Sequence, residues 1–385
     1  MEMNSEIWSS LPEEIIVLVL AKLPTLTIGR FRAVCKQWKS LLSPSLAFQR
    51  ITPFVHPCST PAFLIGRLHP SHWVNSLNSN LYLLQSLPNS HMYRLSLDFL
   101  APDSINVVTA CKSVLCCSKN GAPTSFYICN PVTKTCKELP PSIQLRQYDF
   151  VGLAFDVSTR LCILVIGRTV IMAEENHMVV EIYDSEINSW TTLQIKTPKT
   201  VYPLGEGVYS RGTFYWINST YLGVSRCRFD VAAFHVKERH WDVIRHPQRP
   251  YGPYSNHLYY WRLSGYDGKV VLVYTKGLCL WELDEDNRDE EENRQRWLEL
   301  AALPKKLCGE VRCGGVVNDI SSQRCTQVVV NSSGWILVHL PRNKLVVFDG
   351  LGRMMQSIEG RQLTTFTQTY PTSVRAFEVN NVWWP

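Results

Sequence analysis

The feature that most constrains the fold of this chain is a two-strand unit that recurs along most of its length. In each copy an apolar run ends in a short polar turn and is followed by a second run that carries Trp or Leu. The copies span residues 81–97, 126–139, 180–193, 232–244, 278–300 and 344–358, and the first of them is degenerate. Trp190, Trp241 and Trp297 mark three successive copies, at intervals of 51 (241 − 190) and 56 (297 − 241) residues. Such a repeat predicts an array of similar β-sheets.

Each copy has room for a further hairpin ahead of it, most clearly at residues 207–217, where Ser210-Arg211-Gly212 reads as the turn. Four strands per unit are therefore expected. A lone four-stranded sheet cannot bury both of its faces, whereas sheets stacked in a ring can. Six copies predict about six blades, and residues 377–384 predict a strand that returns to the first blade. The alternative is a different all-β arrangement, such as a pair of sandwiches.

This part of the chain resembles the kelch-like, or F-box-associated, domain of plant F-box proteins. Kelch-type blades repeat about every 50 residues. The resemblance covers most of residues 60–385 and implies a β-propeller.

The N-terminal residues carry a different, helical period. Apolar residues follow Pro12 at helical spacing, a second apolar stripe runs from Ile28 to Leu42, and Leu23-Pro24 interrupts them. A segment of this size, below roughly 40 residues, rarely buries enough apolar surface to stand alone. Its surplus apolar surface predicts a partner site; packing against the rest of the chain is the alternative.

Residues 8–50 resemble the F-box family. The matching residues are Leu11-Pro12, Leu23-Pro24, Arg30, Arg32, Val34-Cys35-Lys36, Trp38 and Leu41-Leu42. The resemblance implies docking onto a Skp-type adaptor, which links the protein to a cullin ubiquitin ligase. The residues expected to dock are Leu11, Pro12, Ile16, Leu20, Leu23, Pro24, Val34, Cys35, Trp38 and Leu41.

The predicted protein is mainly β with a small α domain. We expect an F-box-like helical domain at residues 1–50, a proline-rich linker at residues 51–62 and a kelch-like β-propeller at residues 63–385.

Composition excludes several classes of protein. The net charge of +6 is mild and no basic run of the kind that binds nucleic acid occurs. No signal peptide is recognisable, and the longest apolar runs fall far short of the roughly 20 residues of a membrane span. The scattered cysteines, with no CxxC pair, predict reduced thiols. We therefore expect a protein of the nucleus, the cytoplasm or both.

No motif for bond chemistry stands out. The His residues are dispersed, and no metal-ligand spacing, nucleophile motif or phosphate loop occurs, so we expect no catalytic residue, no metal and no cofactor. Gly205-Glu206-Gly207 reads as a bulge ahead of a strand. Asp230, Asp242 and Asp349 read as turn residues at strand ends.

One face of the expected propeller has the composition of a binding surface. Connections after the second and fourth strands of a blade leave from one face, and these are residues 140–149, 194–206, 218–228, 245–261 and 301–312. They are rich in Arg, Lys and Tyr and poor in acids, a mixture typical of protein-binding surfaces; ordinary loop solvation is the alternative. The candidate client-binding residues are Arg226, Arg228, Arg245, Arg249 and Arg312. The acidic run Asp284–Glu292 falls on the opposite face and predicts a solvated, flexible loop.

These features predict a non-catalytic, substrate-recognition adaptor of an SCF-type cullin ubiquitin ligase. The helical segment would dock the adaptor and the propeller would hold a client protein, which the basic face suggests is acidic or phosphorylated. Two alternatives remain at this point, a small-molecule-responsive sensor F-box protein and a propeller enzyme.

Overall fold

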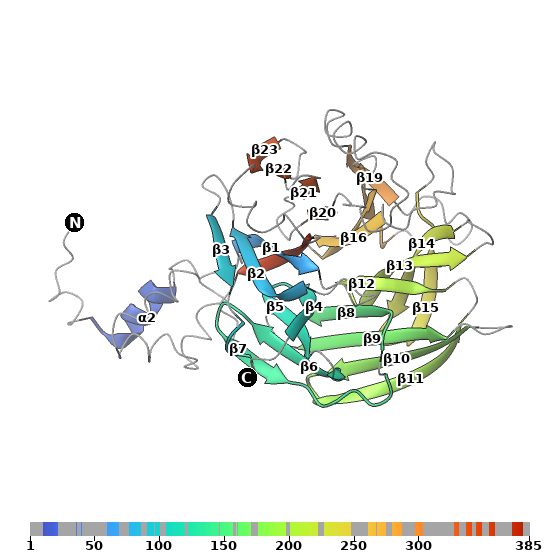
Figure 1. Cartoon of the computed structure of the whole chain (residues 1–385), viewed down its shortest axis with the longest axis horizontal. Coiled ribbons are helices and arrows are strands. Elements are labelled where there is room, and N and C mark those ends of the chain that lie inside the picture. Colours follow the sequence, from blue (N-terminus) through green and yellow to red (C-terminus); the bar gives the residue numbers. More distant parts are fainter. Residues whose placement is uncertain are drawn as a thin grey trace.

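The sheets of the protein surround a common centre (Figure 1). This computed structural model describes residues 11–21, 36, 40, 60–68, 77–85, 91–95, 97–100, 105–119, 122–145, 147–156, 159, 161–170, 176–197, 201–221, 227–247, 261–266, 268–274, 279–286, 297–302, 327–330, 336–340, 344–348, 354–358 and 372–379. Helix α2 (Glu13–Ala21) lies outside the ring of sheets.

The described strands form two eight-stranded sheets, each made of two four-stranded units, and two further four-stranded sheets, which together give six blades. From the innermost strand outward, blade 1 consists of β24 (Thr372–Val379), β1 (Thr60–Leu68), β2 (Leu77–Gln85) and β3 (His91–Leu95). Blade 2 consists of β4 (Ile105–Cys111), β5 (Val114–Lys119), β6 (Ala122–Asn130) and β7 (Thr135–Glu138). Blade 3 consists of β8 (Phe150–Phe155), β9 (Cys162–Val170), β10 (Asn176–Asp184) and β11 (Ser189–Thr197).

The second half of the chain repeats the pattern. Blade 4 consists of β12 (Pro203–Ser210), β13 (Thr213–Tyr221), β14 (Cys227–His235) and β15 (His240–Ile244). Blade 5 consists of β16 (Trp261–Tyr266), β17 (Lys269–Tyr274), β18 (Cys279–Leu283) and β19 (Trp297–Ala302). Blade 6 consists of β20 (Gln327–Val330), β21 (Ile336–Leu340), β22 (Lys344–Phe348) and β23 (Met354–Ile358). The six sequence copies are the third and fourth strands of the six blades, which confirms the predicted β-propeller.

The innermost strands close the ring. Each contacts the next, in the order β4, β8, β12, β16, β20, β24 and back to β4. The last described strand, β24, pairs antiparallel with β1 from Thr60↔Val379 to Arg67↔Thr372. A strand was predicted to return to the first blade at residues 377–384; β24 does so, but it begins at Thr372, five residues earlier (377 − 372), and residues 380–384 lie outside the described residues.

The core lies between neighbouring blades. One apolar cluster joins blades 3 and 4 through Phe150, Met178, Phe214 and Trp216, all fully buried. Equivalent clusters join blades 1 and 2, 2 and 3, 4 and 5, and 5 and 6. At these five joints, neighbouring blades therefore bury one another's faces, as ring stacking requires.

The hairpins between the third and fourth strands share one turn geometry. Lys134, Asn188 and Arg239 each directly precede the outer strand, and all three have positive φ, at 57°, 49° and 55°. Asn130 and Asp184 open two of these turns, and the Oδ1 atom of each accepts the N–H two residues later. A side-chain oxygen that caps its own turn in this way favours a tight reversal.

The repeated tryptophans occupy equivalent positions in the outer strands. Trp190 faces Tyr183, Trp241 faces Phe234 and Trp297 faces Leu283 in the strand register. The three indoles are 7%, 8% and 8% exposed. The predicted equivalence is confirmed.

Blades 3 and 4 are joined through their innermost strands. Gly205 to Gly207 of β12 pair in parallel with Phe150 to Gly152 of β8. A Cβ atom on Gly207 would collide with Trp216 Nε1, which donates to Val151 O at 2.9 Å. The register of β12 shifts between Leu204 and Val208. A bulge was predicted here ahead of a strand; the irregularity lies inside β12, and the absence of a side chain at Gly207 leaves room for the Trp216 indole.

The boundary between the two predicted domains lies mostly outside the described residues. Strand β1 begins at Thr60, inside the predicted linker and three residues (63 − 60) ahead of the predicted propeller start. The division at residues 50 and 62 stays a prediction. No helix in the described part of the chain is long and apolar enough to cross a membrane.

Candidate functional site

The described part of the docking segment is the helix α2. It begins after Pro12, whose carbonyl accepts the N–H groups of Ile15 at 3.0 Å and Ile16 at 3.2 Å. Proline suits the first turn because it has no N–H to satisfy. Ile15, Leu18 and Val19 are 42%, 40% and 38% exposed. The helix thus presents several aliphatic side chains to solvent.

The predicted docking residues are only partly within the described chain. Leu11 is half-buried, Pro12 is exposed and Ile16 is buried. Leu20 lies in α2 with its side chain outside the description, and Leu23, Pro24, Val34, Cys35, Trp38 and Leu41 lie outside the described residues. Their docking role stays a prediction.

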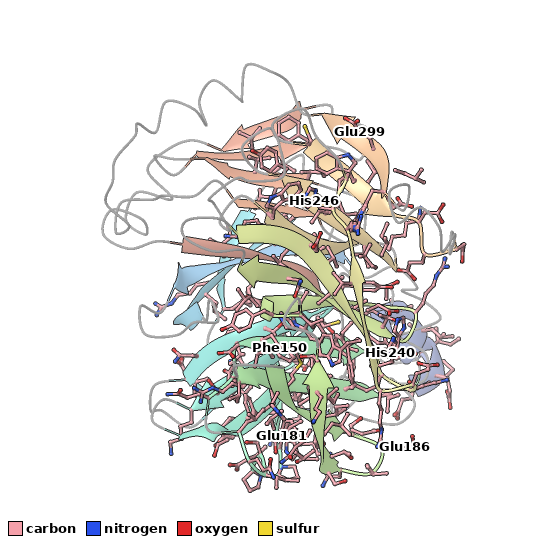
Figure 2. All side chains as sticks on the ribbon, turned by 90° about the vertical axis from the view of Figure 1, so that its right-hand side faces the viewer. Phe150, Glu181, Glu186, His240, His246 and Glu299 are labelled. Carbon is pink, nitrogen blue, oxygen red and sulfur yellow. The ribbon has the colours of Figure 1, made fainter. Side chains whose placement is uncertain are left out.

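The antiparallel blades give the propeller two faces. Connections after second and fourth strands leave from the long-loop face, and those after first and third strands form the short-turn face. Glu186, from a short turn, and His240, the first residue of β15, lie toward the right in Figure 2, away from Phe150 at the start of β8. Arg245 follows β15 on the long-loop face and is exposed. Arg228 lies in β14 with its side chain outside the description, and Arg226, Arg249 and Arg312 lie outside the described residues.

Strand ends add charged groups to the long-loop face that loop composition alone missed. Lys119 ends β5, Arg168 lies near the end of β9 and Arg262 near the start of β16. Burial raises the pKa of Asp149, and the Thr169 N–H, 3.0 Å from Oδ2, and the Arg168 charge offset part of that rise.

Arg245 belongs to a short segment that its neighbours hold in place. The Trp297 indole N–H donates to the Arg245 carbonyl at 2.7 Å. His246 Nδ1 donates to the Pro247 carbonyl at 2.8 Å, and the His246 ring lies 5.6 Å from the Trp261 ring. The segment is therefore bound to blade 5 although it ends blade 4.

The connection between blades 2 and 3 is held by a buried carboxyl group. Glu181 is fully buried in β10 and accepts the N–H groups of Ile143 at 2.9 Å, Gln144 at 2.8 Å and Leu145 at 3.2 Å. Thr192 Oγ1 also donates to it at 3.2 Å. An ionised carboxylate has lone pairs for all four donors. This arrangement orders a loop of the long-loop face while Ile143 stays 57% exposed.

The acidic run begins on the short-turn face, as its place after a third strand requires. Arg211 Nη1 lies 3.0 Å from Asp286 Oδ1, and Arg211 Nε lies 3.9 Å from Glu285 Oε2. Arg211 belongs to the first hairpin of blade 4, so these contacts bridge blades 4 and 5. Residues 287–292 of the run lie outside the described residues.

Comparison with known protein families identifies both parts of the chain. Residues 8–45 match the F-box domain and residues 71–240 match the F-box associated beta propeller domain. The chain is a plant-type F-box protein with an F-box-associated propeller.

Relatives of this F-box protein occur in Arabidopsis thaliana. An F-box protein is 26% identical over 56% of this chain and 61% of its own length. The protein UNUSUAL FLORAL ORGANS is 25% identical over 79% of this chain and 69% of its own length. The chain thus spans about 60% of the first relative. The structure of apo AztD from Citrobacter koseri aligns over 82% of this chain and 98% of its own, with 7% identity and a TM-score of 0.40, which is too low to carry an argument.

The F-box protein also contains a His-Asp network that the sequence interpretation missed. Asp242 accepts hydrogen bonds from His235 Nε2 and His240 Nε2, each at 3.0 Å, and His235 Nδ1 lies 3.0 Å from Thr213 Oγ1. Burial raises the pKa of Asp242, but the bonds to the two imidazoles outweigh it and lower the pKa overall. The network lies on β13, β14 and β15, not on the innermost strand β12.

Two aspartates correct the sequence interpretation. Asp230 is 5% exposed inside β14, and Asp242 is the middle residue of β15, so neither is a turn residue. The strands run further than the turn signals suggested. Asp349 lies outside the described residues. Among the described residues, no group of three or more His, Cys, Asp or Glu side chains could hold a metal ion.

Proposed function

We propose that this protein is the substrate-recognition subunit of an SCF-type cullin ubiquitin ligase and is itself non-catalytic. The observation that carries the proposal is the F-box match at residues 8–45, together with the exposed aliphatic side chains of α2. An exposed apolar helix is what a partner needs in order to bury surface. The partner is a Skp-type adaptor, and through it the cullin scaffold.

In this proposal the propeller holds the client protein. Binding places a client lysine near a ubiquitin carrier and raises their effective concentration, so the chain contributes proximity and no bond chemistry. The long-loop face is the proposed client surface, with Arg226, Arg228, Arg245, Arg249 and Arg312 as its candidate residues. Arginine binds carboxylate and phosphate groups through two parallel hydrogen bonds, which favours an acidic or phosphorylated client. The proposed location is the nucleus, the cytoplasm or both.

Adaptor docking is tested by placing a charge on α2. Leu18→Asp should lower co-purification with a recombinant Skp-type adaptor by at least tenfold, because burying a charge in an apolar contact costs several kcal/mol. Ile187→Asp is the matched control, since Ile187 is an exposed aliphatic residue, 62% accessible, in a propeller turn. Wild-type recovery of the adaptor by Leu18→Asp, with Leu11-Pro12→Ala-Ala equally inert, would rule the docking proposal out.

Client capture is tested by reversing charge on one face at a time. Arg245→Glu combined with Arg228→Glu should reduce ubiquitin-linked client recovered from proteasome-inhibited cells and leave adaptor binding unchanged. Arg239→Glu is the matched control on the short-turn face, where Arg239 is exposed. Equal client recovery from both variants would contradict the assignment of the face.

A further inference from the structure

The segment Arg245 to Pro247 is held by its neighbours, although its first side chain is exposed. Pro247 is buried, His246 is half-buried against Trp261, and the Arg245 carbonyl accepts the Trp297 indole N–H. Arg245 itself is exposed and forms no ion pair within the described part of the chain. The main chain under this guanidinium group is therefore fixed by the next blade, while the charge stays available.

The indole bond recurs at a second joint and is missing at a third. Trp190 donates to the Pro140 carbonyl at 2.6 Å, and Pro140 follows Cys136 by four residues, as Arg245 follows Trp241. Cys136 takes the place of the tryptophan in blade 2. At the joint between blades 3 and 4 the corresponding residue is Gln194, which lies inside β11 opposite Val179. Trp241 Nε1 is buried and has no acceptor among the described residues.

This comparison separates the hydrogen bond from ordinary packing of the blade tryptophan. The indole is buried at all three joints, but it holds a carbonyl only where the outer strand stops before the carbonyl, at Glu138 in β7 and at Ile244 in β15. Of the two segments held in this way, only the one at blade 4 carries a described cation at the held position.

We propose that Trp297 is a positioning residue for the client site, which spans the joint between blades 4 and 5 and captures an acidic or phosphorylated peptide segment at Arg245. The inference rests on the proposed function of the long-loop face, and it adds that the main chain at Arg245 is held in place by blade 5. Because the main chain at Arg245 is already held before the client binds, less conformational entropy is lost on binding. His246 and Trp261 hold the same segment from its other side.

The test uses the full chain bound to its adaptor, with two labelled probes: a degenerate phosphoserine peptide library and an all-glutamate decapeptide. Trp297→Phe should raise the Kd for the better probe by about threefold to tenfold, the range expected when one side chain must be immobilised on binding. The salt dependence of binding should stay as in the wild type, because the charge is still present. Arg245→Glu should abolish the binding of both probes and, with it, the salt dependence of binding.

Two matched variants control for general loosening of the ring. Trp190→Phe removes the same bond at another joint, and Trp241→Phe removes an indole whose N–H has no acceptor among the described residues. Both should therefore bind like the wild type. His246→Leu, which loses the bond to Pro247, should weaken binding as Trp297→Phe does, and it serves as the second test if Trp297→Phe is unstable.

The outcomes separate the inference from the function on which it rests. Unchanged binding in Arg245→Glu, or no binding of either probe by the wild type, overturns the acidic-client face and the inference with it. Loss of binding in Arg245→Glu, with wild-type affinity in Trp297→Phe and His246→Leu, overturns the inference alone. Equal weakening in Trp190→Phe and Trp297→Phe also overturns it, because the effect would then be general.

Discussion

Replacing the three blade tryptophans by phenylalanine, one at a time, measures the indole hydrogen bond against a constant loss of packing. Trp190, Trp241 and Trp297 are almost equally buried, so each change removes a similar volume from the core. Their N–H groups differ. Two donate to backbone carbonyls, at 2.6 Å and 2.7 Å, whereas Trp241 Nε1 has no acceptor among the described residues.

The expected difference follows from the two kinds of donor. A satisfied hydrogen bond contributes about 0.5–1.5 kcal/mol to folding, and a buried unsatisfied donor costs about 1–3 kcal/mol. Trp190→Phe and Trp297→Phe lose the stabilisation of a satisfied hydrogen bond. Trp241→Phe removes the cost of a buried unsatisfied donor and so gains stability. Trp241→Phe should therefore be more stable than either of the others by about 1.5–4.5 kcal/mol, the sum of the two ranges.

The assay is urea unfolding followed by far-ultraviolet circular dichroism, because tryptophan fluorescence changes with the substitution itself. The three variants should share the wild-type slope, so that differences in midpoint report stability alone. Equal destabilisation of all three, or Trp241→Phe as the least stable, would show that ring packing and not the N–H group sets the energy.

Three other changes test separate parts of the propeller. Glu181→Gln should lower the free energy of unfolding by about 1–3 kcal/mol in urea, because the amide puts a donor beside the N–H groups that the carboxyl accepts; unchanged stability would contradict this. Gly207→Ala should cost about 1–3 kcal/mol by overpacking against Trp216, and a thermal midpoint equal to wild type would disprove the close approach. Asp242 has a folded-state pKa below its ordinary 3.8, so its stabilisation is present above that value and lost as pH falls through the folded-state pKa. Because its side chain is 50% exposed, the advantage of wild type over Asp242→Asn should be at most about 1 kcal/mol and should shrink toward pH 3; a difference independent of pH would refute the linkage.

The architecture was predictable because its determinants are local. Strand periodicity, turn residues and the spacing of Trp190, Trp241 and Trp297 all lie within single hairpins, and the ring follows from the need of each sheet to cover both faces. The closing strand was predictable for the same reason, since an apolar run at the end of a repeat array needs a partner. Local patterns failed at Asp242, where a polar residue inside a short strand read as a turn.

Long-range contacts were not predictable. A glutamate between apolar neighbours, such as Glu181, reads as a solvent-facing strand residue, because nothing near it in sequence shows the three N–H groups it accepts from a loop 36 to 38 residues away. Gly207 signalled a bulge but not the indole beneath it. On the long-loop face, loop composition does not point to Arg168, because strand ends also reach that face.

Because β24 pairs with β1, the propeller can close only after the last strand is synthesised. The proposed adaptor docking therefore becomes available before the proposed client binding. The helix α2, at residues 13–21, leaves the ribosome before any blade, while blade 1 keeps an open edge on β1 until residues 372–379 arrive. An open edge is a template for pairing with other chains. A message that stops before residue 372 would therefore yield a chain that could still occupy an adaptor yet has no closed ring to hold a client. Under the proposed function, such a product would compete with the full-length protein for the adaptor without holding a client.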